Sequence, residues 1–374
     1  MISKRTSGLI LLLTLFVATL YLAADSLPSQ LSDDAFWKLI ADVSEADGSF
    51  AGENYVSNEP QYASVLAELQ KTAKPGGVYI GVGPEQNFNY IAATRPKMAF
   101  IIDIRRQNAL EHLMYRALFE MSADRAAFLS RLFSRERPAG LSETSSVTQL
   151  MDAYWALPEN TTVFDKNLQD IRNKLSADHG FALADDDFRT IAKIYKIFSQ
   201  WGAATNYASD SAVGARIARG EINVFPTFSA LMKMTDSTGK ATSFMANEES
   251  YRFVRDLEMK GLVVPVTGDF AGPKAIRAIG QYLKDHNVTV SAFYVSNVET
   301  YLLRPPNPSL PAIANGGWKN YMANVAMLPI DDGSVFLRWP ATDRPGQVDL
   351  IKDTLRLDGE GKIKSIGDLT TNRR

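Results

Sequence analysis

The chain of 374 residues contains no cysteine and only three histidines. Without cysteine it can form no disulfide, no thiolate-ligated zinc or iron–sulfur site, and no thiol nucleophile. Three scattered histidines do not predict a histidine-rich metal centre, so we expect no metal. The charge is nearly balanced, with 40 Lys and Arg against 42 Asp and Glu and no long basic run. This composition argues against a nucleic-acid partner.

One long apolar run is present, at residues 8–24, between the basic pair Lys4 and Arg5 and the acidic Asp25. The pattern predicts either a secretory signal peptide or a single membrane anchor in residues 1–24. Positive charge before the run and negative charge after it predict that the rest of the chain lies outside the cytoplasm. We therefore expect a periplasmic or secreted protein, or one anchored in the membrane through residues 8–24 alone.

The rest of the chain predicts a layered α/β protein. Four unbroken apolar runs predict buried strands at residues 78–82, 98–102, 262–266 and 288–295. Apolar runs without alternation are typical of parallel strands covered on both faces. Helical spacing of apolar residues predicts a helical insertion over residues 107–202, after the second strand. The order predicts a doubly wound, Rossmann-like α/β sheet.

The remaining segments complete the predicted organisation. We interpret residues 25–60 as an N-terminal lead-in and residues 61–340 as the sheet domain. Asp331-Asp332-Gly333 predicts a hairpin between strands at residues 325–330 and 335–339. Asp358-Gly359-Glu360-Gly361 predicts another hairpin over residues 355–366, so that residues 341–374 form a C-terminal hairpin or tail.

Glycine and polar residues stand at the carboxyl end of each of the four predicted strands. In chain order they are Gly81 and Gly83, Asp103, Asp269, and finally Ser296, Asn297 and Glu299. In open parallel sheets, ligands bind beyond these strand ends. Glycine lets a ligand approach the backbone, and a carboxylate such as Asp103 can accept hydrogen bonds from both hydroxyls of a ribose. Each of these residues also has a structural interpretation that involves no ligand: the glycines can form tight turns, the aspartates can cap helices, and Ser296, Asn297 and Glu299 can make contacts within a loop.

The segments VYIGVGPEQN, FIIDIRR, VVPVTGDF and FYVSNVE resemble motifs one to four of class I S-adenosylmethionine-dependent methyltransferases. The resemblance covers about residues 61–339, apart from the helical insertion. It implies that Gly81 and Gly83 wrap the methionine end of the cofactor and that Asp103 holds its ribose. It further implies that Asp269 lies near the adenine. The fourth motif, with Ser296, Asn297 and Glu299, would lie beside the transferred methyl group.

The chain also resembles an uncharacterised family of exported bacterial proteins with this fold. Two features depart from the methyltransferase pattern, because Gln86 stands at the third glycine position and the fourth motif lacks Pro-Pro. Three functions therefore stay open: methyl transfer from S-adenosylmethionine to an unknown acceptor, a non-catalytic binding or interaction role, and a nicotinamide-dependent oxidoreductase. Export itself separates the chain from S-adenosylmethionine, which cells make in the cytosol.

Overall fold

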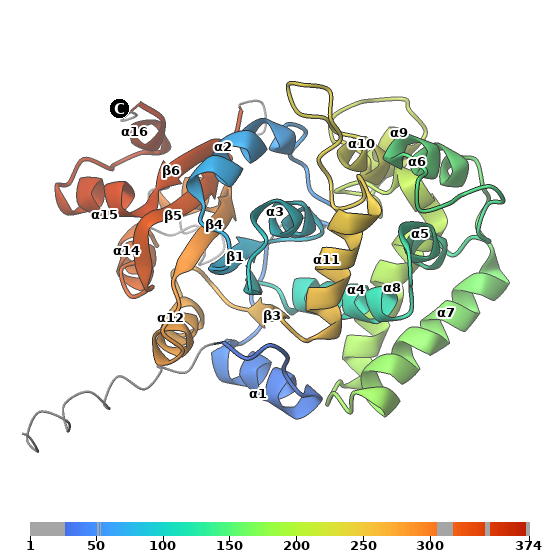
Figure 1. The fold of residues 1–374 in the computed structure, drawn as a ribbon, viewed down its shortest axis with the longest axis horizontal. Coiled ribbons are helices and arrows are strands. Elements are labelled where there is room, and N and C mark those ends of the chain that lie inside the picture. Colours follow the sequence, from blue (N-terminus) through green and yellow to red (C-terminus); the bar gives the residue numbers. More distant parts are fainter. Residues whose placement is uncertain (1–26, 51, 53, 305–316, 341–344, 372–374) are drawn as a thin grey trace, which may run out of the picture.

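A computed structural model describes residues 27–50, 52, 54–304, 317–340 and 345–371. Its centre is a six-stranded, mostly parallel sheet surrounded by helices (Figure 1). The strands are β1 (Val78–Val82), β2 (Met98–Asp103), β3 (Val263–Thr267), β4 (Val290–Ser296), β5 (Ile330–Arg338) and β6 (Gln347–Leu350). Their order is β3-β2-β1-β4-β5-β6, and only β6 runs antiparallel to its neighbour.

Helices cover both faces of the sheet, which explains why the parallel strands are apolar on both sides. One face carries α1 (Asp33–Val43), α12 (Ala275–Asp285) and α14 (Trp318–Val325). The other carries α2 (Leu66–Thr72), α3 (Gln86–Thr94), α4 (Arg106–Glu120) and α11 (Glu248–Met259). Short α13 (Val298–Leu302) follows β4, and α15 (Ile351–Gly359) and α16 (Ile366–Thr371) end the described chain. The mixed α/β prediction is confirmed.

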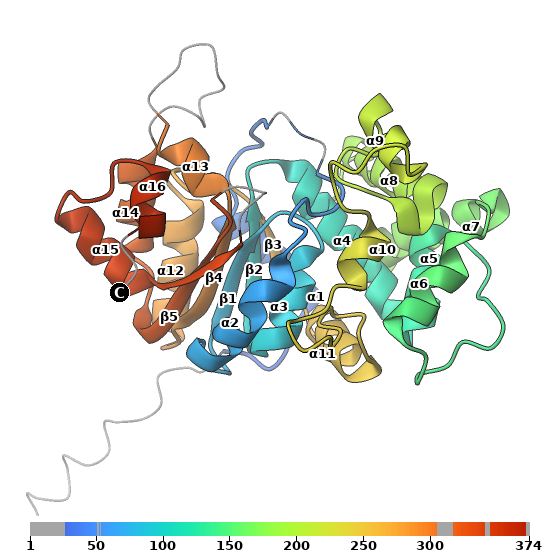
Figure 2. The same ribbon diagram turned by 90° about the horizontal axis from the view of Figure 1, so that it is seen from above.

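A separate group of helices lies beyond α4, on the side of the molecule away from β5 (Figure 2). It contains α5 (Arg125–Phe133), α6 (Val147–Trp155), α7 (Thr161–Asn173), α8 (Asp185–Trp201), α9 (Ala212–Ala218) and α10 (Phe228–Met232). Short 3-10 or π turns occur at Tyr62–Val65, Lys174–Asp178 and Gly202–Ala204. Helices fill the range predicted for the insertion, residues 107–202, but α4 within that range covers the sheet, and α9 and α10 extend the helical group past residue 202.

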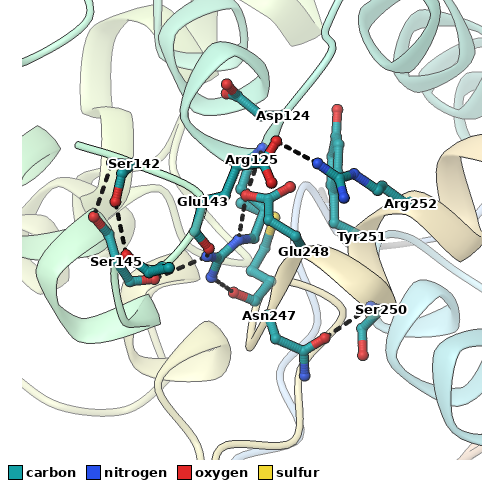
Figure 3. A network of polar contacts seen from close by, with 12 residues as sticks. Asp124, Arg125, Ser142, Glu143, Ser145, Asn247, Glu248, Ser250, Tyr251 and Arg252 are labelled. Carbon is teal, nitrogen blue, oxygen red and sulfur yellow. Dashed lines mark hydrogen bonds and ion pairs between the residues drawn. The ribbon is translucent and has the colours of Figure 1, made fainter.

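A buried arginine ties this helical group to α11 (Figure 3). Arg125 is only 1% exposed, and its Nε donates to Glu248 Oε1 at 2.8 Å. Its remaining nitrogens donate to the carbonyls of Met245, Glu143 and Ser145 at 2.8–2.9 Å. One guanidinium thus joins the start of α5, the loop before α6 and the start of α11.

The two predicted hairpins are wrong. Val325 ends α14, and residues 330–338 form the single strand β5. Asp331 Oδ1 accepts the Gly333 N–H at 2.7 Å, while the β4–β5 register shifts between Val290 and Ala292. The Asp-Asp-Gly signal therefore makes a bulge within one strand rather than a chain reversal. Residues 355–366 contain the end of α15 and the following turn, and the antiparallel pair is instead β5 with β6.

The predicted signal peptide or anchor, residues 1–24, lies outside the described residues. Within the part of the chain that is described, no helix has both the length and the apolar character needed to cross a bilayer.

Candidate functional site

A cavity lies at the carboxyl ends of β1 to β4, next to the position where the strand order reverses between β1 and β4. Five of the seven residues predicted for the site line it: Gly83, Asp103, Asp269, Ser296 and Asn297. The sheet register brings them together, since β1 is hydrogen-bonded to both β2 and β4, and β2 to β3. The expectation that four strand ends form one crevice is therefore confirmed.

Side-chain hydrogen bonds hold the loop after β1 in shape. Gly83 has a φ of +78°, which favours glycine, and it borders the cavity. Asn87 Nδ2 donates to the carbonyls of Val82, Gly83 and Pro84 at 2.7–3.0 Å. His112 Nε2 lies 2.9 Å from the Gly83 oxygen; burial lowers the pKa of His112 to about 4, so the neutral ring donates this bond.

Gly81 does not line the cavity, and its role is internal. A Cβ at this position would stand 1.9 Å from Asn87 Oδ1 and 2.7 Å from the Tyr79 ring. The absent side chain makes room for Asn87, whose Oδ1 accepts the Tyr79 hydroxyl at 2.9 Å. Gly81 therefore shapes the loop that presents Gly83.

The two aspartates face the cavity from neighbouring strand ends. Asp103 Oδ1 accepts the Arg105 N–H at 2.9 Å, and burial raises the pKa of Asp103 despite the opposing Arg105 guanidinium. Asp269 Oδ1 accepts the Ala271 N–H at 2.8 Å, and burial raises the pKa of Asp269 as well. Both carboxyls are thus helped into place by the backbone that follows them.

The fourth motif divides between two environments. Ser296 and Asn297 line the cavity. Glu299 is buried and pairs with Arg338, with Oε2 to Nε at 2.5 Å and Oε1 to Nη2 at 3.1 Å. Glu299 Oε1 also accepts the Tyr321 hydroxyl at 3.2 Å. This carboxylate joins α13 to β5 and does not border the cavity.

Residues before β1 form a further wall that sequence reasoning did not assign to the site. Phe50, Asn54, Ser57 and Asn58 line the cavity. The segment is anchored by Glu45, whose carboxylate accepts the N–H groups of Asp269, Lys274 and Ala275 at 2.7–3.2 Å. No spacing rule connects this lead-in to the strand ends, so its residues gave no signal in the sequence.

The helical group contributes Tyr207, and α13 contributes Tyr301, to the same cavity. The Phe50 and Tyr301 rings meet edge to face at 5.5 Å between centroids. Aromatic rings therefore lie around the polar strand-end residues Asp103, Asp269, Ser296 and Asn297, which we call the polar floor of the cavity. This arrangement suits a planar ligand with a few fixed polar groups.

Two buried carboxyls lie behind the polar floor. Glu59 accepts hydrogen bonds from Ser296 Oγ, Tyr294 Oη and Gln86 Nε2 at 2.6–2.8 Å, and burial raises its pKa to about 7. Glu85, which precedes α3, accepts the Ser57 N–H at 3.1 Å, and burial raises its pKa to about 8. The described residues contain no group of three or more His, Asp or Glu side chains arranged to hold a metal ion.

Comparison with known proteins gives a family but no activity. A search of curated proteins returned no match. The model of a family described as a domain of unknown function, DUF7790, matches residues 55–348. This range is most of the chain, and it includes strands β1 to β5, the start of β6, the helical group and all seven residues predicted for the site. The chain therefore belongs to the DUF7790 family.

Proposed function

We propose that the cavity binds S-adenosylmethionine and that the protein transfers its methyl group to an acceptor. The observation that carries this proposal is the meeting of Gly83, Asp103, Asp269, Ser296 and Asn297 at one cavity. These residues come from all four segments that resemble methyltransferase motifs. The strand order, with a reversal between β1 and β4 and an antiparallel strand beside β5, further supports a Rossmann-like class of fold.

The residues present fit an adenosyl group. Gly83 carries no side chain, and a Cβ there would have Asn54 Nδ2 as its nearest neighbour at 3.5 Å, so its backbone is open to a ligand. Asp103 can accept the two ribose hydroxyls. Ile104 and Phe270 supply apolar surface beside the aspartates for a planar base.

The charge of the site favours a sulfonium over a dinucleotide. Asp103 and Asp269 line the cavity, and Glu59 and Glu85 lie behind it. Glu85 stands at the N-terminus of α3, which is where a Rossmann dinucleotide places its pyrophosphate. Burial raises the pKa of Glu85 to about 8, so this carboxyl is mainly neutral at neutral pH, and the negative charge that opposes a pyrophosphate comes from Asp103 and Asp269, which line the cavity; this charge argues against the nicotinamide-dependent alternative.

Within this proposal the side chains bind and orient. Asp103 and Gly83 would hold the cofactor, Asp269 would contact its base, and Ser296 and Asn297 would face the acceptor. S-adenosylmethionine supplies an activated methyl group on a positively charged sulfur. The protein's contribution is to hold the acceptor in line with that group, since orientation alone accounts for much of a two-substrate rate enhancement.

The test is isothermal titration of the full chain with S-adenosylmethionine and S-adenosylhomocysteine. We expect saturable binding below millimolar ligand. Asp103→Ala should weaken it about ten- to a hundredfold, because a hydrogen bond to a charged group contributes roughly 1.5–3 kcal/mol. Asp331→Ala, in the β5 bulge at the other end of the sheet, is the matched control and should bind normally. No heat at millimolar ligand would overturn the proposal.

A second candidate is a ligand-binding protein without chemistry. It is favoured by the engagement of Glu299 with Arg338, which leaves only Ser296 and Asn297 of the predicted catalytic group at the cavity. Formation of S-adenosylhomocysteine over time separates the two candidates, because a pure binder consumes no ligand.

We also propose that the folded part of the chain lies outside the cytoplasm, as the charge pattern around residues 8–24 indicates. A C-terminal reporter that is active only in the periplasm tests this. No activity from this reporter, together with activity from a C-terminal reporter that works only in the cytosol, would contradict export and would place the domain where S-adenosylmethionine is made.

A further inference from the structure

Glu59 lies directly behind two hydroxyls of the cavity. Ser296 Oγ donates to Glu59 Oε1 at 2.6 Å, and Tyr294 Oη donates to Glu59 Oε2 at 2.8 Å. Both hydroxyl-bearing residues line the cavity, whereas Glu59 is 1% exposed and does not. Its third donor, Gln86 Nε2 at 2.6 Å, approaches from α3. Hydrogen bonds from these two hydroxyl groups therefore connect Glu59 to the cavity.

The backbone of Ser296 is held in an unfavourable conformation. Its φ of +50° lies in the left-handed region, which residues with a Cβ rarely adopt. The strand partners hold it there: the Trp339 N–H donates to the Ser296 oxygen at 2.7 Å, and the β4–β5 register shifts between Tyr294 and Ser296. Strained residues of this kind are concentrated at functional sites, and here the strain accompanies a hydroxyl shared by the cavity and a buried carboxylate.

We propose that Ser296 and Glu59 form a proton-accepting pair for the methyl acceptor, and hence that the acceptor reacts through an O–H or N–H group. This inference rests on the proposed methyl transfer. Transfer forms a bond from the acceptor oxygen or nitrogen to the methyl carbon and breaks the carbon–sulfur bond, whose electron pair stays on sulfur. One acceptor proton must then leave. It passes to Ser296 Oγ as the Ser296 proton passes to Glu59, so Ser296 ends unchanged and Glu59 ends protonated.

The surroundings of Glu59 suit this exchange at neutral pH. Burial raises the pKa of Glu59 to about 7, against the lowering effect of its three hydrogen bonds. The titratable groups around it are Tyr79, Tyr90, Tyr294 and Glu85. Burial raises the pKa of each of these groups, so the tyrosines keep their protons. Glu85, whose pKa rises to about 8, accepts the Ser57 N–H, whereas Glu59 accepts the Ser296 hydroxyl, so Glu59 is the carboxyl titrating near neutrality that is hydrogen-bonded to Ser296. A proton acceptor works best when its pKa lies near the working pH.

The experiment uses the full chain, radiolabelled S-adenosylmethionine and a set of small acceptor probes. Phenol, benzyl alcohol and benzylamine carry a removable proton, and dimethyl sulfide does not. Wild type should methylate at least one of the first three, with a rate that rises with pH through a midpoint near 7. Glu59→Gln should lower that rate at least a hundredfold and remove the midpoint, while the affinity for S-adenosylmethionine stays within twofold.

Two further variants complete the test. Ser296→Ala leaves Glu59 in place and should lower the rate at least tenfold, which keeps the proposal testable if Glu59→Gln does not fold. Glu258→Gln removes another buried carboxyl, on α11 and outside the cavity, and should have no effect on rate or pH profile.

Three results would overturn the pair: an unaltered rate and pH profile in Glu59→Gln, transfer to dimethyl sulfide alone, or binding of S-adenosylmethionine without transfer to any protic probe. Failure of the wild-type protein to bind S-adenosylmethionine at all would instead reject the proposed function.

Discussion

Ser296 and Glu299 belong to one short motif, yet their side chains serve different purposes. Ser296 faces the cavity, and Glu299 is held by Arg338 in a buried pair whose side chains are 2% and 3% exposed. Removing one partner of such a pair leaves an uncompensated charge away from water. Loss of activity on replacing Glu299 would therefore not show a catalytic role, because the replacement also destabilises the fold.

We predict that Glu299→Ala lowers the free energy of unfolding by about 3–5 kcal/mol. Lys352→Ala, which breaks the exposed pair with Asp332, should cost less than about 1 kcal/mol. Urea unfolding followed by circular dichroism measures both. Equal stability of the two variants would show that the Glu299–Arg338 pair is not a structural clamp.

The sequence predicted five of the cavity residues because the carboxyl ends of parallel strands must meet at one edge. It could not predict Glu59, since this residue lies in the turn-rich segment before α2 and reaches Ser296 only through the folded sheet. Nor could it separate Gly81 from Gly83, because the difference depends on the Asn87 side chain that fills the space beside Gly81. Contacts between distant segments leave no periodic mark in a single sequence.

Among the secondary-structure elements, the helices were predictable and the C-terminal turns were not. Helix α6 begins after a capping box, with Ser146 accepting from the Gln149 N–H, and the Asn247 side chain caps the start of α11 by accepting the Ser250 N–H. By contrast, Asp331-Asp332-Gly333 has turn chemistry that a bulge and a hairpin share. Ser334 Oγ decides the outcome: it accepts the Asp331 N–H at 2.8 Å and donates to the Val290 oxygen at 2.6 Å, which fixes the bulge against β4.

We predict that the helical group depends on Arg125. Arg125→Met removes its hydrogen bonds to Glu248 and to three carbonyls and should destabilise the protein by about 3–5 kcal/mol. Limited proteolysis should then cut the loop between α5 and α6 faster than in wild type, because Arg125 holds the carbonyls of Glu143 and Ser145 in that loop.

Arg252 provides the matched control for this variant. It lies in the same network (Figure 3) and pairs with Glu143 at the surface, where the two side chains are about half exposed. Arg252→Met should change stability by less than about 1 kcal/mol and leave the digestion pattern intact. Similar digestion of the two variants would mean that Arg125 does not tie the helical group to α11.

For the whole molecule, buried carboxyls make stability depend on pH. Burial raises the pKa of Glu59 and Glu85 to about 7 and about 8, and it also raises the pKa of Glu111 and Glu258. Each group holds its proton more tightly in the folded state. Its stabilising contribution is therefore complete below pH 4.5 and is lost as the pH rises through the folded-state pKa.

We predict that the free energy of unfolding falls between about pH 5 and pH 9, with Glu59 alone contributing about 3 kcal/mol to the decline. His112, whose pKa burial lowers to about 4, opposes the decline below about pH 6.5, so the fall is steepest above that pH. His179, which lies between Asp33 and Glu120, also makes stability fall as the pH rises. Burial lowers the pKa of His179, but the hydrogen bond to the Glu120 carboxylate raises it by more, so the pKa lies above its ordinary value. Urea unfolding at several pH values measures the slope. Glu85→Gln should flatten it, and a flat wild-type profile would contradict the assignment.

The hydrogen bond between Glu59 and Ser296 also has a consequence for biosynthesis. Glu59 is translated before β1 and Ser296 at the end of β4, with the helical group between them. Until Val290 leaves the ribosome, the β1 edge that will pair with β4 has no partner. An open, apolar edge in a growing chain is a target for chaperones and a starting point for aggregation. Expression at low temperature, which weakens the association of exposed apolar surface, should therefore raise the soluble yield of this protein more than that of a protein whose sheet closes between neighbouring segments.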